Sequence, residues 1–206
     1  MMLEKAPLPP AEHLPEPPVQ ESSPPRPVSW LLRRWPTLVA VALVGPDLIG
    51  GGENAGGGFA TFGQTLPMLA LIYLLMAKIG KRWATWPIVL AVAGTVAVTL
   101  ALDVVTPSAV LIGASLLLLV WVTITGELHA SSTLRLQALG VVLFCGLAIT
   151  GLVMDPEIGT YVIAAGWFLH GIWDFVHLWR DRVVSRTFAE WCGVFDVLIA
   201  VQLLLL

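Results

Sequence analysis

The chain has 206 residues, of which 57% are hydrophobic and only 12% are charged, and its mean hydropathy is +0.84. Soluble globular domains carry about 25% charged residues, so this composition excludes an ordinary water-soluble domain and predicts a chain embedded in a lipid bilayer. The formal net charge of −3 is small and gives no indication of nucleic-acid binding.

Residues 1–29 form a segment unlike the rest of the chain. Nine of the fifteen prolines lie between Pro7 and Pro27. Proline fixes φ and lacks a backbone donor, so this stretch is unsuited to a helix or a sheet. With few bulky apolar groups, it is predicted to be a disordered tail on the cytoplasmic side.

The remaining chain, 30–206, is predicted to be an all-α, polytopic membrane helix bundle. A helix needs about 20 apolar residues to cross about 30 Å of hydrocarbon. About seven stretches approach this length, although the first is short. They cover 36–51, 62–79, 84–102, 108–125, 134–154, 158–178 and 188–206.

The basic residues predict the orientation of these segments. Lysine and arginine accumulate in cytoplasmic loops. Threading seven spans through a membrane places all eleven basic residues on one side. The sequence therefore predicts a protein of the cell membrane with its N-terminus in the cytoplasm and its C-terminus outside. The basic residues are Lys5, Arg26, Arg33, Arg34, Lys78, Lys81, Arg82, Arg135, Arg180, Arg182 and Arg186.

The sixth predicted segment carries three polar side chains on one stripe. His170, Asp174 and His177 are spaced i, i+4 and i+7, and at 100° per residue they share one helix face. Ionisable groups inside hydrocarbon are costly and usually face the protein interior. Two imidazoles and a carboxylate are suitable ligands for zinc or iron, and histidine also suits proton transfer.

The seventh predicted segment adds further polar groups at a similar depth, because it runs antiparallel to the sixth. Cys192 and Asp196 share a helix face at i, i+4, whereas Glu190 points about 120° away from Asp196. Together, the two segments predict a His/Asp/Glu site that faces the cytoplasm.

Several functions are compatible with this site. In a metal-dependent membrane enzyme acting on a lipid or other apolar substrate, His170 and His177 are ligands and Asp174 is a third ligand or orients an imidazole. Asp196 or Glu190 is then the general base. A small proton-coupled carrier, self-associated as a homo-oligomer, is the alternative, with Asp174 and Asp196 alternately protonated. In a scaffold without chemistry, the same groups only pair helices.

The predicted topology is similar to that of the progestin/adipoQ receptor and hemolysin III family. That family has seven spans, a cytoplasmic N-terminus and a metal site near the cytoplasmic leaflet, with an HxxxH motif on its last helix. The last predicted segment here, 188–206, contains no histidine. The resemblance is one of topology, and no ligand or reaction is transferred to this chain.

Overall fold

The structure, a computed structural model, describes residues 33–49 and 58–205. Within these ranges every regular element is a helix, and there is no strand. The predicted tail, 1–29, lies outside the described residues. The all-α prediction is therefore confirmed for the part of the chain that the structure describes.

The long helices cover the same stretches as the predicted segments, and two short elements lie between them. Pro107 and Pro156 stand at the first positions of their helices, where a missing backbone N–H costs nothing. Thr106 and Asp155 cap those two helices through side-chain oxygens. The elements are α2 (Trp35–Ile49), α3 (Gly58–Ile79), η2 (Arg82–Ala84), α4 (Thr85–Leu102), α5 (Pro107–Ile124), α6 (Glu127–Ala130), α7 (Ser132–Val153), α8 (Pro156–Arg180) and α9 (Arg186–Leu205).

Five helices of the described residues are long and apolar enough to cross a membrane, which fits a membrane protein. They are α3, α4 together with η2, α5, α7 and α9. Helix α8 is continuous over 25 residues, but the polar side chains of His170, Asp174 and His177 interrupt its apolar sequence. Helix α2 is apolar but has only 15 residues. The count of seven spans and the orientation stay predictions.

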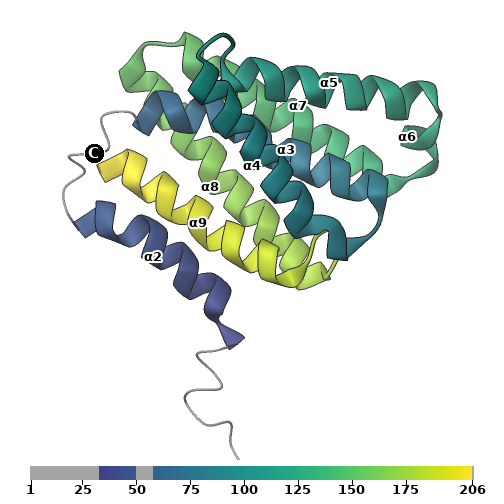
Figure 1. The fold of residues 1–206 in the computed structure, drawn as a ribbon, viewed down its shortest axis with the longest axis horizontal. Helices are drawn as coiled ribbons and strands as arrows, with labels where there is room; N and C mark the ends of the chain where they lie inside the picture. The colour runs from purple at the N-terminus through teal and green to yellow at the C-terminus, as the bar shows by residue number, and fades with distance from the viewer. Residues whose placement is uncertain (1–32, 50–57, 206) are drawn as a thin grey trace, which may run out of the picture.

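The bundle exposes many large apolar side chains and encloses a small set of buried polar ones within an apolar core. Helix α3 packs against α4, α5, α7 and α8, and α9 lies between α8 and α2 at the edge of the bundle (Figure 1). Large apolar side chains such as Leu117 and Ile124 are 74% and 78% exposed, whereas His170 and Asp196 are fully buried. This distribution suits a hydrocarbon solvent, in which buried polar groups must find partners within the protein.

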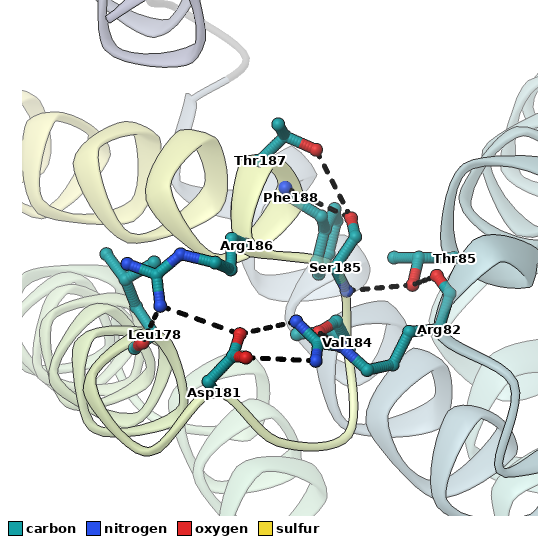
Figure 2. A network of polar contacts seen from close by, with 9 residues as sticks. All are labelled: Arg82, Thr85, Leu178, Asp181, Val184, Ser185, Arg186, Thr187 and Phe188. Carbon is teal, nitrogen blue, oxygen red and sulfur yellow. Dashed lines mark hydrogen bonds and ion pairs between the residues drawn. The ribbon is translucent and has the colours of Figure 1, made fainter. Parts of the chain in front are cut away.

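The turn between α8 and α9 is fixed to the start of α4 by a network of polar contacts (Figure 2). Asp181 accepts hydrogen bonds from the guanidinium of Arg82, and Arg186 lies 3.5 Å from the same carboxylate. The backbone N–H of Ser185 donates to Thr85 Oγ1 at 3.0 Å. The network therefore holds the end of α8 and the start of α9 against the start of α4.

Because Asp181 must be ionised to form these contacts, the stability that this turn contributes depends on pH. The hydrogen bond from Arg82, with the positive charges of Arg82 and Arg186, lowers the pKa of Asp181 below its ordinary value of 3.8. A lowered folded pKa adds stability that is fully present above the unfolded pKa and is lost as the pH falls through the folded value.

We therefore expect wild type to unfold at a higher temperature than Asp181→Asn at neutral pH, with a constant difference down to about pH 4. Below that pH the difference should shrink and vanish. Thermal unfolding of the two proteins in detergent, over a series of pH values, measures it. A difference that persists unchanged at about pH 2 contradicts the role of this carboxylate.

Candidate metal centre

The candidate centre, the cluster of polar side chains around His170, lies where α8 and α9 pack closely together at Gly171 and Gly193. A Cβ placed on Gly171 would lie 3.0 Å from Val197 Cγ2 and 3.2 Å from the carbonyl oxygen of Gly193. A Cβ on Gly193 would lie 3.2 Å from the Cβ of Asp174. Small residues let membrane helices pack backbone to backbone. The glycines therefore bring the polar face of α8 directly against that of α9.

At this crossing His170 lies between two carboxylates. Its Nδ1 is 2.7 Å from Asp196 Oδ2 and 3.3 Å from Asp174 Oδ2, and all three side chains have no exposed surface. An imidazole nitrogen carries at most one proton. His170 Nδ1 donates that proton to Asp196, the nearer of the two. Asp174 Oδ2 therefore receives no hydrogen bond from this imidazole in a low-dielectric interior.

The unmatched atoms can be identified. Within the described residues, Asp174 Oδ2 and His170 Nε2 are buried and have no hydrogen-bond partner. The ring of Phe144 packs edge-on against the imidazole, with the centroids 4.8 Å apart. Buried polar groups are nearly always paired, so these two atoms are available to a cation or to another hydrogen-bonding group.

Tyr73 on α3 is a member of the centre that the sequence analysis missed. Its hydroxyl donates to Asp174 Oδ1, and its side chain is only 1% exposed. Its ring packs edge-on against His170 at 5.5 Å. A buried tyrosine needs a partner for its hydroxyl. A tyrosine in the middle of the apolar segment 62–79 was therefore a signal that could have identified it.

Cys192 completes a set of four possible ligands. Its Sγ lies 3.8 Å and 3.9 Å from the two carboxylate oxygens of Asp196, one helical turn away. His170, Asp174, Cys192 and Asp196 each offer a nitrogen, oxygen or sulfur atom, and these atoms lie within 4.8 Å of one another. Helical periodicity predicts the shared face of Cys192 and Asp196, but it does not identify the cysteine as a ligand.

The structure does not bring His177 into this cluster. Its Nδ1 lies 2.8 Å from the carbonyl oxygen of Trp173 and must donate, because a carbonyl only accepts. Its Nε2 therefore accepts from Gln137 Nε2 at 3.0 Å. Both ring nitrogens are occupied. The ring instead packs edge-on against Tyr73, with centroids 4.8 Å apart, on the side toward the α8–α9 turn.

Glu190 also lies apart from the centre. Its Oε1 accepts hydrogen bonds from Thr37 Oγ1 at 2.7 Å and from Arg34 Nη1 at 3.1 Å, both next to or on α2. The predicted angular separation of Glu190 from Asp196 explains this placement, since the two side chains leave α9 on different faces. Of the predicted site residues, the structure brings together His170, Asp174 and Asp196.

The assembled centre can bind a cation. It offers an imidazole, two carboxylates and a thiol in a dry interior, with a phenol that fixes one carboxylate. Zinc and iron bind several nitrogen, oxygen and sulfur ligands at once. A proton, in contrast, binds to a single carboxylate oxygen and does not need the other groups. No family model, curated protein sequence or solved structure matches this chain.

Proposed function

We propose that the chain is a metal-dependent membrane enzyme that acts on a lipid or other apolar substrate. The observation that carries the proposal is the convergence of His170, Asp174, Cys192 and Asp196 within 4.8 Å, fully inside the bundle. A thiol adds nothing to a proton relay but is a strong ligand for zinc or iron. Cys192 therefore favours a metal over a proton.

The charges of the centre support the same conclusion. Two carboxylates that share one imidazole proton leave a net negative charge in a medium where an uncompensated ion is very costly. A divalent cation would balance the two carboxylates and satisfy Asp174 Oδ2, which has no hydrogen-bond partner among the described atoms. We assign Zn²⁺ or Fe²⁺ to the site.

The roles within the site follow from the contacts. His170, Asp174 and Cys192 would hold the metal, with Cys192 in the place predicted for His177. Three protein ligands leave a coordination position open, as in catalytic zinc sites, where the metal acts as a Lewis acid. Asp196 is then the general base, and Tyr73 positions Asp174 through its hydrogen bond.

The proposed topology is seven spans in the cell membrane, with the N-terminus in the cytoplasm. The ion pairs Lys78–Glu127 and Arg82–Asp181 join the ends of α3 to the turns after α5 and α8. The segment after α3, with its basic residues, thus meets the turns after α5 and α8 at one end of the bundle, which supports the location of these three turns on a single membrane face. Large exposed apolar surfaces on α4 and α5 support the placement of these helices in the bilayer.

Metal analysis of purified protein tests the assignment. We expect about one zinc or iron per chain in wild type, and loss of the metal in Asp174→Asn and in His170→Gln. After exchange for Co²⁺, wild type should show a thiolate-to-cobalt charge-transfer band. Cys192→Ser should lose this band while weak cobalt binding persists, which separates loss of the ligand from loss of the fold.

Two substitutions serve as matched controls. His177→Gln and Glu190→Gln each change a polar residue on the same helices as the ligands, but outside the four-residue cluster. Both should retain the metal and the charge-transfer band. If His177→Gln loses the metal while Cys192→Ser keeps the cobalt spectrum of wild type, the ligand set is wrong.

A second candidate is a proton-coupled carrier, which one chain of contacts favours. His177 lines a pocket at the α8–α9 turn and packs on Tyr73, and Tyr73 in turn donates to Asp174. These contacts connect the bundle surface with Asp174, a buried carboxylate whose Oδ2 has no hydrogen-bond donor among the described residues. Protein free of metal, with pH-dependent solute uptake in proteoliposomes that Asp174→Asn abolishes, would establish the carrier instead of the enzyme.

A further inference from the structure

A second polar site lies outside the metal centre, in a cavity between the start of α7 and the end of α8. The cavity has a volume of about 290 Å³. Its polar lining combines two guanidinium groups, two hydroxyls, an imidazole and an amide. These belong to Arg180, Arg182, Ser132, Thr133, His177 and Gln137.

The two arginines of this cavity carry uncompensated positive charge. In the same turn, Asp181 is held by Arg82 and Arg186, as Figure 2 shows. Arg180 and Arg182 flank Asp181 in sequence but form no ion pair within residues 33–49 and 58–205. Asp181 therefore pairs with Arg82 and Arg186, whereas Arg180 and Arg182 have no acidic partner among the described residues and lie beside the cavity. Arginine forks match phosphate oxygens in charge and geometry.

The first turn of α7 adds donors of the same kind. Ser131 caps this 22-residue helix by accepting from the backbone N–H of Leu134. The N–H groups of the preceding positions, Ser132 and Thr133, have no carbonyl within the helix to accept them. A helix N-terminus also carries a partial positive charge. Backbone and side chains thus favour an anion at the same mouth of the cavity.

Gln137 supplies an independent sign of a ligand. It lines the cavity and is 1% exposed, and its Nε2 donates to His177. Its Oε1 is buried and has no hydrogen-bond partner in the described structure. Because an amide oxygen only accepts, it needs a donor such as a hydroxyl. An anion that fits every group here carries both a phosphate and a hydroxyl.

The position of the cavity favours a lipid as the source of that anion. Trp83 and Trp179 lie at the same end of the bundle and are 75% and 83% exposed. Exposed tryptophans mark the interface of a membrane, where lipid phosphates lie. We propose that this cavity binds the headgroup of an anionic phospholipid through its phosphate and a headgroup hydroxyl, as phosphatidylglycerol would provide. The proposal does not depend on a metal in the centre.

Lipid titration of the full chain in an uncharged detergent tests the proposal. Short-chain phosphatidylglycerol, phosphatidic acid and phosphatidylcholine are each titrated and followed by calorimetry. We expect phosphatidylglycerol to bind most tightly and phosphatidylcholine least. The double variant Arg180→Gln/Arg182→Gln should weaken phosphatidylglycerol binding by about 30-fold.

The matched control is Lys81→Gln/Arg135→Gln, which removes two exposed charges from the same end of the bundle but outside the cavity. It should change the affinity by less than about threefold. Equal weakening in both double variants, or none in either, overturns the site.

Inorganic phosphate and glycerol 3-phosphate are tested separately as competitors of the lipid. If they compete fully with the lipid, the ligand is a soluble phosphate ester; if they do not, it is the lipid.

Discussion

Replacing His170 with leucine is expected to destabilise the protein by about 3 kcal/mol, measured in the presence of a chelator. The substitution leaves Asp174 and Asp196 facing each other in the interior, with Tyr73 as the donor to only one of them. Breaking a buried pair by removing one partner is costly because it strands a charge. Reversible unfolding in mixed detergent micelles provides the measurement.

A triple variant separates charge from packing. In His170→Leu/Asp174→Asn/Asp196→Asn, the two carboxylates are replaced by amides that can bond to each other. Because no charge is stranded, most of the lost stability should return, even though three polar residues have changed instead of one. A triple variant that is no more stable than His170→Leu alone would show that the lost stability does not come from the stranded carboxylate charges.

Introducing a leucine at Gly171 is expected to force α8 and α9 apart and to abolish metal binding. Even a single Cβ at this position meets Val197 and the backbone of Gly193, so a larger side chain has no space. Overpacking of this kind costs about 1 to 3 kcal/mol. A shift of either helix also separates the ligands of α8 from those of α9. Thermal unfolding and metal content measure the two effects.

Gly146 on α7 provides the control for this substitution. A Cβ there would meet nothing within 4 Å, so Gly146→Leu adds the same bulk without a clash. It should keep both the unfolding temperature and the metal of wild type. If Gly171→Leu unfolds at the wild-type temperature and still binds metal, the close crossing of the helices does not hold the centre together.

The membrane character of the chain and its helices could be predicted from the sequence because both depend on local patterns. Runs of apolar residues of the right length mark the helices, and prolines such as Pro107 and Pro156 mark their starts. The stripe at His170 and Asp174 follows from helical periodicity alone. The antiparallel relation of the last two segments then suffices to place Asp196 near them.

The rest of the centre depends on the rotational orientation of each helix about its own axis within the bundle. Sequence periodicity does not specify this orientation. Tyr73 lies about a hundred residues before Asp174, on a helix whose buried face cannot be read from a uniformly apolar sequence. His177 belongs to the same stripe as His170, but Trp173 and Gln137 occupy its nitrogens. Glu190 was predicted to point away from Asp196, but its partners on the N-terminal side of the chain had no sequence signal.

The contact of Glu190 with Arg34 and Thr37 couples the first described helix to the donors of the centre. Glu190 precedes Cys192 by two residues on α9, so this contact attaches α2 to the helix that carries both Cys192 and Asp196. The shortest of the long helices is therefore anchored, through α9, beside two of the four possible ligands.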